Sequence, residues 1–244
     1  MRTLVISDIH GCHDEFNSLL KKVKYEPTED KLILLGDYID RGLKSKQVVD
    51  QVMRMVKEND VVALKGNHDQ MGVDALSKAD DQYSAHWIRN GAITTLTSYC
   101  GAEIFEEGFD WDAYDKTKEY IVDNYKHHLD FLSSLPLYLE TDEHIFVHAG
   151  INPLLKDWKK TKEEDFYWIR DLFYSQANGN TEKTVVFGHT PVVNIHDSAD
   201  IWFSPHGDKI GIDGACAYGK QLNCLEISEE GYQNHCVRKG EWYH

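Results

Sequence analysis

Short apolar runs alternate with amphipathic segments over the first 65 residues of the chain. Residues 4–6, 31–35 and 60–64 are nearly continuous apolar runs, the pattern of strands buried inside a domain. Residues 15–23 and 45–57 carry apolar side chains at helical spacing, and Ser45 stands where an N-cap is expected. This alternation predicts an α/β fold that begins in the order βαβα.

The pattern changes after the third predicted strand. Residues 69–135 are aromatic-rich and helical in spacing, which predicts a helical cap embedded in the fold. Further strands are predicted at residues 144–147, 184–187, 209–212, 222–227 and 233–238. These late strands follow one another without an evident helix, so we expect a more antiparallel second half. Because no repeat or linker interrupts the chain, we expect a single domain spanning residues 1–244, with the cap insertion at about 70–135.

Polar motifs stand at the ends of five predicted strands. They are Asp8-Ile9-His10-Gly11, Gly36-Asp37-Tyr38-Ile39-Asp40-Arg41, Gly66-Asn67-His68-Asp69, His148-Ala149-Gly150 and Gly188-His189-Thr190. Ligands of α/β sheets gather at the carboxyl ends of strands, so the motifs are expected to converge. Oxygen and imidazole donors together suit Mn, Fe or Zn. Two such ions sharing one carboxylate activate a water and neutralise a phosphoryl group, which points to phosphoester hydrolysis.

Charge and cysteine content narrow the choice of partner and compartment. A net charge of -15 disfavours a nucleic-acid duplex and leaves phosphorylated proteins or small molecules open. The sequence has no apolar run of about 18 residues and no signal-peptide pattern, so we expect no membrane partner and a cytoplasmic protein. The five cysteines are scattered without a Cys-x-x-Cys pair, which argues for reduced thiols and against a disulfide framework or a thiolate zinc site.

The order of these motifs resembles the calcineurin-like metallophosphoesterases. The stretch Asp37-Tyr38-Ile39-Asp40-Arg41-Gly42 is similar to PPP-type serine/threonine phosphatases of the compact bacterial and bacteriophage kind. Symmetrical diadenosine tetraphosphatases share almost all of the same motifs. The resemblance implies a four-layer α/β/β/α sandwich with the helical cap embedded in it.

The resemblance also implies a role for each motif residue. Asp8 and His10 would bind one metal, Asp37 would bridge two, and Asn67, His148 and His189 would complete the second. Asn67 would also contribute to phosphate binding. His68 would donate a proton to the leaving oxygen, with Asp40 holding its imidazole and favouring the protonated form. Arg41 would clamp the phosphoryl oxygens, and Trp168-Ile169-Arg170 matches the usual context of a second arginine, Arg170. The implied reaction is direct attack by a metal-bridging hydroxide without a covalent phosphoenzyme.

The function expected from the sequence is therefore hydrolysis of phosphomonoesters by two divalent ions, Mn above all, with Fe or Zn as alternatives. The favoured substrates are phosphoserine and phosphothreonine proteins, with phosphotyrosine included. The alternative is a symmetrical bis(5'-nucleosyl)-tetraphosphatase or another nucleotide phosphohydrolase. A scaffold that has lost catalysis is disfavoured, because every motif residue is present. The native metal and the oligomeric state stay open, with a monomer favoured.

Overall fold

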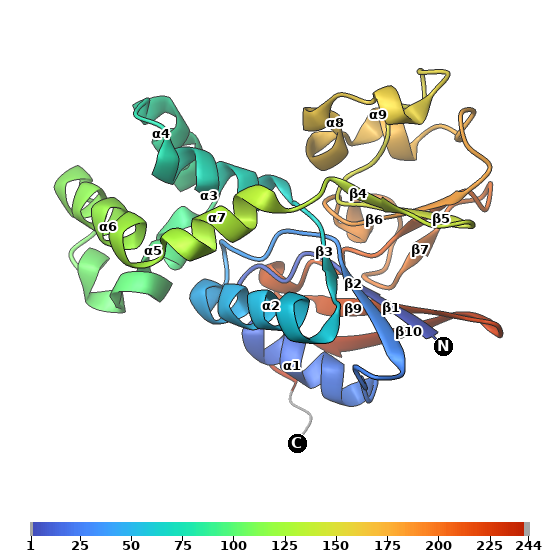
Figure 1. Ribbon diagram of the computed structural model, residues 1–244, viewed down its shortest axis with the longest axis horizontal. Helices are drawn as coiled ribbons and strands as arrows, with labels where there is room; N and C mark the ends of the chain where they lie inside the picture. The colour runs from blue at the N-terminus through green and yellow to red at the C-terminus, as the bar shows by residue number, and fades with distance from the viewer. Residues whose placement is uncertain (1, 242–244) are drawn as a thin grey trace.

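A computed structural model describes residues 2–241, and it contains two mixed five-stranded sheets (Figure 1). The first sheet has the order β10-β9-β1-β2-β3. Its strands are β1 (Arg2–Ile6), β2 (Asp30–Leu34), β3 (Val62–Ala63), β9 (Gln221–Ser228) and β10 (Gly231–Arg238). The strands β1, β2 and β3 run parallel and are connected by α1 (His13–Lys22) and α2 (Ser45–Asn59), as the apolar pattern predicted. The strand β9 pairs antiparallel with β1, which brings the end of the chain beside its beginning.

The second sheet has the order β4-β5-β6-β8-β7, and its centre is parallel. Its strands are β4 (Tyr138–Glu140), β5 (His144–Val147), β6 (Thr184–Phe187), β7 (Trp202–Phe203) and β8 (Lys209–Gly211). The expectation that no helix separates the late strands is wrong, because η2 (Trp158–Lys160), α8 (Glu163–Trp168) and α9 (Asp171–Tyr174) connect β5 to β6. These helices are too short to show a clear helical repeat in the sequence. Only the edge pairs β4–β5 and β7–β8 are antiparallel in this sheet as the structure describes it.

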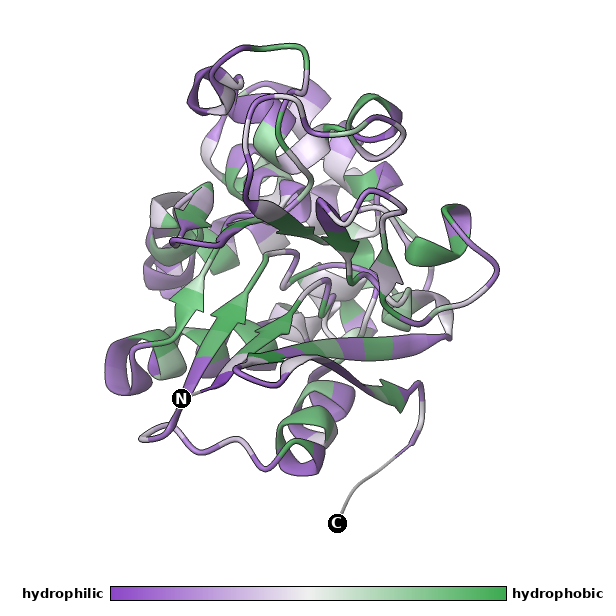
Figure 2. Cartoon of the chain, turned by 90° about the vertical axis from the view of Figure 1, so that its right-hand side faces the viewer, coloured by the Kyte–Doolittle hydropathy of each residue, from purple (hydrophilic) through white to green (hydrophobic). Residues whose placement is uncertain are grey.

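Three apolar clusters divide the molecule into four layers, which confirms the expected sandwich. One cluster lies between the two sheets and includes Val5, Ile33, Phe146 and Ile210. A second packs α1 and α2 on the outer face of the first sheet, and a third packs the α8–α9 segment on the outer face of the second. Figure 2 shows the corresponding apolar strands facing the interior. Burial of these faces is the main stabilising contribution to the fold.

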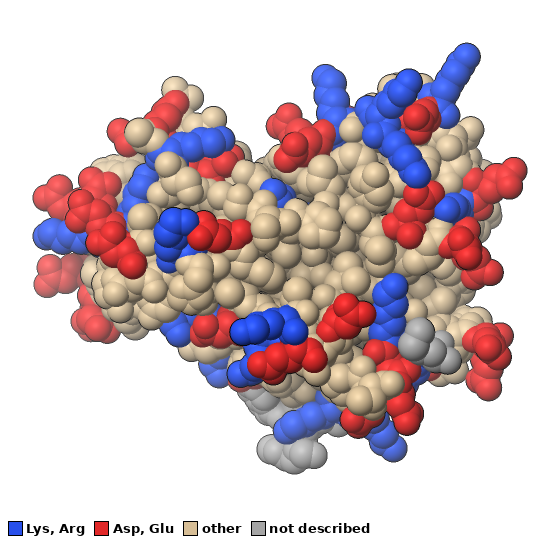
Figure 3. Space-filling model, viewed as in Figure 1, with Lys and Arg blue, Asp and Glu red and all other residues tan. Residues whose placement is uncertain are grey.

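The cap consists of helices that extend away from the two sheets (Figure 1). They are α3 (Asn67–Ser77), α4 (Asp81–Arg89), α5 (Ala92–Cys100), η1 (Ala102–Phe105), α6 (Trp111–Asn124) and α7 (Lys126–Ser134). Trp87, Leu96 and Leu132 of the cap belong to the same apolar cluster as α1 and α2. Acidic side chains gather at the α6 end (Figure 3), where Glu106, Glu107, Asp110, Asp112 and Asp115 are exposed.

Ser45 does not cap α2 as expected, because it is the first residue of the helix and Lys44 is the N-cap. The Ser45 hydroxyl instead accepts a hydrogen bond from the Asp40 backbone at 3.2 Å. The hydroxyl therefore fixes the loop that carries the second motif. Among residues 2–241, no helix has the length and apolar character needed to cross a bilayer.

Candidate metal centre

Six candidate ligands converge where strands of both sheets end. Asp8 follows β1, Asp37 follows β2, His148 follows β5 and His189 follows β6, while Asn67 begins α3. Each side chain is at least 95 % buried, and the six are Asp8, His10, Asp37, Asn67, His148 and His189. Burying so many polar groups is unfavourable unless each one has a partner. The convergence predicted from the strand ends is therefore present in the fold.

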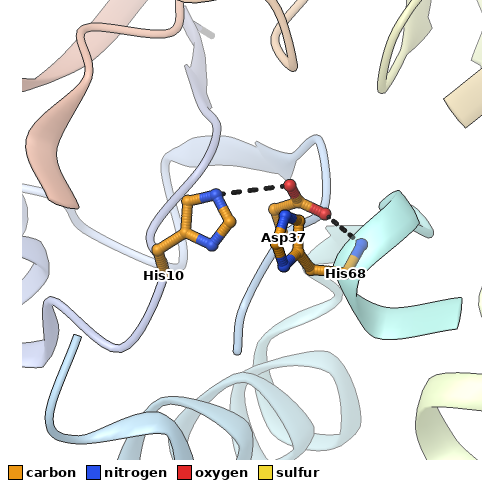
Figure 4. Close-up of side chains that lie close together, drawn as sticks. All are labelled: His10, Asp37 and His68. Carbon is orange, nitrogen blue, oxygen red and sulfur yellow. Dashed lines mark hydrogen bonds and ion pairs between the residues drawn. The ribbon is translucent and has the colours of Figure 1, made fainter. Parts of the chain in front are cut away.

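Asp37 lies between two groups of possible ligands. His10 and His68 form one group with it, and His148 and His189 form the other. The Nε2 atom of His10 is 3.3 Å from Asp37 Oδ2 (Figure 4). The Nε2 atom of His148 is 3.5 Å from Asp37 Oδ1. Asp37 Oδ1 also accepts a hydrogen bond from the His68 backbone N–H at 2.9 Å, so the carboxylate is held between the two groups, which is the position that a bridging ligand requires.

Backbone carbonyls orient two of the imidazoles toward the centre. The Nδ1–H of His10 donates to Ile39 O, and that of His148 donates to Leu35 O, each at 2.8 Å. Since a carbonyl can only accept, both rings carry their proton on Nδ1 and present the Nε2 lone pair inward. Burial lowers the pKa of both histidines, which keeps them in the neutral form that binds metal.

His189 supplies a further sign that a cation fits here. Its Nε2 atom is buried without a hydrogen-bond partner among residues 2–241, while its ring bonds the backbone of Trp168. An unsatisfied buried acceptor costs about 1–3 kcal/mol, and a divalent cation would satisfy it. Asp8 is directed to the same place, because its Oδ2 accepts from the His189 backbone at 3.0 Å and from the Ser7 hydroxyl.

Arg41 places positive charge directly on this donor set. Its guanidinium donates to His10 Nε2 at 2.6 Å and to His68 Nε2 at 2.8 Å. Two lone pairs that could bind a metal are thus already satisfied by a cation. The donor set of carboxylate, amide and imidazole therefore fits divalent ions such as Mn, Fe or Zn.

His68 and Asp40 form a buried pair beside the ligands. The Nδ1 atom of His68 is 2.7 Å from Asp40 Oδ2. Burial raises the pKa of Asp40 to about 7, whereas burial and the charge of Arg41 lower the pKa of His68. The protonated His68 that we expected therefore needs additional negative charge nearby, which a phosphoryl group would bring.

Several residues act on the site without having been singled out from the sequence. Trp87 donates its Nε1–H to Asp40 at 2.9 Å, and Thr95 donates to the same carboxylate at 2.7 Å. The Asp69 carboxylate accepts from the backbone of Asp37 at 2.8 Å, which fixes the loop after β2. Asp213, at the end of β8, is buried near Asp8, and burial together with Asp8 raises its pKa. Asp213 could have been recognised from the sequence, because it is a polar residue directly after a predicted strand, as the other motif residues are.

The backbone of the site is strained. Six of its residues that are not glycine have φ between 44° and 73°, namely Asp8, His10, Asp37, Asp40, Arg41 and His189. L-residues avoid this left-handed region because the Cβ atom crowds the backbone. Strain of this kind persists where surrounding contacts impose it, and it concentrates at functional sites.

An open rim borders the buried centre. Arg170 is exposed between α8 and α9, and its Nη1 donates to His189 O at 3.1 Å. The Tyr218 ring lies 4.9 Å from the Arg41 guanidinium carbon. A cavity of about 420 Å³ adjoins this rim, with Arg170, Tyr218 and Lys220 in its lining. The two arginines thus reach the centre from different segments of the chain.

Residues 1–221 match the family described as calcineurin-like phosphoesterase. The chain belongs to this family. Members use divalent metals, which agrees with the ligand groups around Asp37. This phosphoesterase is 29% identical to an asymmetrical bis(5'-nucleosyl)-tetraphosphatase of Anoxybacillus flavithermus, over 92% of the chain and 90% of that protein. It is 27% identical to serine/threonine-protein phosphatase 1 of Salmonella typhimurium, over 91% of the chain and 90% of that protein.

Solved structures agree with the fold of this phosphoesterase. A metallophosphoesterase from Sphaerobacter thermophilus superposes with a TM-score of 0.59 at 15% identity, covering 97% of the chain and 88% of that structure. A cold-active protein tyrosine phosphatase superposes with a TM-score of 0.60 at 14% identity, covering 97% and 78%. At these identities the similarity establishes the shared fold, and the substrate is a separate question.

Proposed function

We propose that this phosphoesterase removes single phosphoryl groups from phosphoserine and phosphothreonine side chains of proteins, with phosphotyrosine also accepted. The observation that supports a two-metal reaction most directly is the position of Asp37 between the two groups of imidazoles. Asp8 and His10 would hold one ion, and Asn67, His148 and His189 would hold the other, with Asp37 shared. Bound there, the two ions would activate water and neutralise phosphoryl charge.

The remaining residues would position the substrate and move a proton. Arg41 and Arg170 would hold the phosphoryl oxygens, a task suited to the planar guanidinium fork. His68 would protonate the leaving oxygen through Nε2. This atom and His10 Nε2 both accept from the Arg41 guanidinium, so both point toward the same centre. Asp40 would hold the ring through Nδ1 and stabilise its positive charge. Asn67 would contribute its amide to the same phosphate pocket.

The openness of the rim favours a protein substrate. Leu43 is 76% exposed and Tyr218 is 61% exposed, and both belong to loops beside Arg41. A phosphorylated side chain on a macromolecule could reach the arginines without entering a closed tunnel. The exposed acidic residues at the α6 end of the cap would also disfavour a long polyphosphate lying across it.

Hydrolysis of bis(5'-nucleosyl)-tetraphosphates is the second candidate. The rim cavity has two cations in its lining, Arg170 and Lys220, which could hold phosphates beyond the one that reacts. Relatives with similar sequence identity to this chain are named for one activity or the other. A symmetrical bis(5'-nucleosyl)-tetraphosphatase of Nitrosococcus oceani, for example, is 25% identical over 94% of each chain.

A direct comparison of substrates separates the two candidates. We expect a higher kcat/KM for phosphoserine and phosphothreonine peptides than for diadenosine tetraphosphate on the metal-loaded protein. Lys220→Ala should leave peptide turnover within about twofold of wild type, and the exposed Lys156→Ala serves as its control. A higher kcat/KM for diadenosine tetraphosphate, falling at least about tenfold in Lys220→Ala alone, would assign the second function instead.

A further inference from the structure

A second cluster of metal-binding side chains lies outside the candidate metal centre. The Cys12 and Cys216 thiols and the Glu15 carboxylate place their ligand atoms within 4.8 Å of one another. All three residues are at least 97% buried. Cys12 and Glu15 belong to the start of α1, whereas Cys216 begins η4 (Cys216–Tyr218). The pairing of β9 with β1 brings these distant segments together, so sequence spacing gave no sign of the cluster.

The cluster already holds one positive charge. The Nζ atom of Lys239 is 3.0 Å from Glu15 Oε1 and 3.4 Å from Cys12 Sγ. The side chains of Cys12 and Cys216 are also hydrogen-bonded to each other. The Lys239 side chain is 39% exposed, so its ammonium group can move toward solvent without unfolding the surrounding chain. The ammonium group would stay beside the cluster and leave the space between Cys12 Sγ and Glu15 to another cation, while Glu15 Oε1 keeps the hydrogen bond from the Gly240 backbone N–H at 3.2 Å.

A cavity open to solvent is lined by two of the three proposed ligand residues, Cys12 and Glu15. Its volume is about 360 Å³, and Cys12, Glu15 and Lys239 are part of its lining. Gly42 and Leu43 form another part of the wall. A metal site needs an access route as well as suitable ligands, and the cavity provides one.

We propose that Cys12, Cys216 and Glu15 bind a thiophilic divalent cation of the Zn²⁺ class, at a site separate from the centre around Asp37. Two thiolates and one carboxylate carry three negative charges, which a divalent cation and the Lys239 ammonium group balance. The two thiols would each release one proton to solvent on binding. A tetrahedral zinc ion with bonds of about 2.3 Å to sulfur needs ligand atoms about 3.7 Å from one another. The three ligand atoms here lie within 4.8 Å of one another, close to that requirement, and water would be the fourth ligand.

Occupancy of this site would join segments that border the reaction centre. Cys12 lies two positions after His10, and η4 ends at Tyr218, whose ring contacts Arg41. The cation would cross-link the loop after β1 to the segment after β8. A ligand that binds the folded state alone raises stability, so occupancy should raise the melting temperature.

Sulfur distinguishes this site from the other centre in a direct measurement. Cd²⁺ added to the reduced full-length protein should produce a thiolate-to-metal charge-transfer absorption in the ultraviolet, saturating at one equivalent per chain. The candidate ligands around Asp37 contain no sulfur and give no such band. Cys12→Ser and Cys216→Ser should each remove most of the absorption, and Glu15→Gln should weaken affinity by roughly tenfold. Cys100→Ser is the matched control, since Cys100 is a free, half-buried thiol on α5.

A measurement on the wild-type protein covers the case in which a variant fails to fold. Cd²⁺ or Zn²⁺ should protect Cys12 and Cys216 from alkylation, read by peptide mass spectrometry, and leave Cys100 reactive. Absence of the band at saturating Cd²⁺, or an equal band in the Cys12→Ser/Cys216→Ser double variant, would overturn the proposal. A Cys12–Cys216 disulfide that persists in place of metal binding would overturn it too. These readouts do not depend on phosphatase activity, so their failure leaves the proposed function untouched.

Discussion

His68 differs from the neighbouring imidazoles in what its Nδ1 atom contacts. His10 and His148 each bond a backbone carbonyl, which holds a neutral ring for metal binding. His68 bonds the Asp40 carboxylate, which stabilises a positively charged ring once a proton arrives. This difference supports a proton donor at His68, although its Nε2 lies close enough to His10 and Asp37 to be counted with them as a possible ligand.

Replacing His68 by Asn separates these two roles. We expect metal content to stay near the wild-type value and kcat for an alkyl phosphomonoester to fall by roughly 10²–10⁴, the usual contribution of a positioned proton donor. The loss should be smaller for p-nitrophenyl phosphate, whose leaving group needs no proton. Elemental analysis and steady-state kinetics measure both quantities, with exposed His127→Asn as the control. Loss of metal from His68→Asn would instead make His68 a ligand.

Asp40 should make the stability of the metal-free protein depend on pH. Burial raises its folded-state pKa from 3.8 to about 7, so the folded state binds a proton that the unfolded state has released. Stability therefore falls as pH rises through this interval, by about 3 kcal/mol between pH 5 and pH 8 for this group. Urea unfolding of chelator-treated protein should show a shallower fall in Asp40→Asn. The exposed Asp115→Asn should keep the wild-type slope, and equal slopes in all three proteins would refute the assignment.

At the scale of elements, the cap helices α4 and α5 hold the Asp40–His68 pair in place. Trp87 on α4 and Thr95 on α5 both donate to Asp40, and Thr95 also accepts from the Asp40 backbone at 2.8 Å. Together with His68, these two residues supply the hydrogen-bond donors that the fully buried Asp40 carboxylate requires. The cap is thereby connected to the chemistry through hydrogen bonds as well as through apolar packing.

Thr95→Val tests this connection. The valine has a similar shape and cannot hydrogen-bond, so we expect a loss of about 1–3 kcal/mol in the free energy of unfolding. We also expect kcat to fall with little change in KM, because Asp40 no longer holds His68 in one position. Thr97→Val is the control on the same helix, since Thr97 donates only to Thr94 O among the contacts described. Equal kinetics in the two variants would show that the cap packs without positioning Asp40.

The elements also mark where prediction from the sequence succeeded and where it did not. The strands β1, β2, β5 and β6 each end in three consecutive buried apolar residues, and this pattern located them. The helix α9 has four residues and β7 has two, so neither displays a period. Missing these short helices led to the wrong expectation about the second sheet, whose central strands are parallel.

At the scale of the whole molecule, metal binding should be inseparable from stability. We expect two ions per chain at the centre around Asp37, counted by elemental analysis of the Cys12→Ser/Cys216→Ser variant so that the proposed thiolate site does not contribute, and a loss of activity in excess chelator. Each ion at about 100 times its dissociation constant would add about 2.7 kcal/mol to the free energy of unfolding. Asp37→Asn should weaken both ions and His189→Ala mainly one. A protein saturated by one ion, or fully active in chelator, would contradict the shared role of Asp37.

Residues of the candidate centre could be predicted where they belong to a recognisable motif. Residues without a motif, which reach the centre only because the chain folds, could not. Asp8, Asp37 and His148 stand in recognisable strings at strand ends, and all reach the same place. Thr95 has no such string, because its partner Asp40 lies 55 positions away. Cys12 and Cys216 are also far apart in the sequence and form no recognisable string. Pairings of this kind depend on the topology of the sheets, which spacing along the chain does not encode.

The strained backbone of the centre has a consequence for directed evolution. Six residues held in a left-handed conformation cost about 1 kcal/mol each, a large share of the 5–15 kcal/mol by which a domain is stable. Glycine adopts that conformation freely. A library selected for heat resistance alone should therefore accumulate glycine at positions such as Arg41, whose side chain is only half-buried, and the survivors should be robust and inactive. Thermal selection of this protein needs a simultaneous screen for turnover.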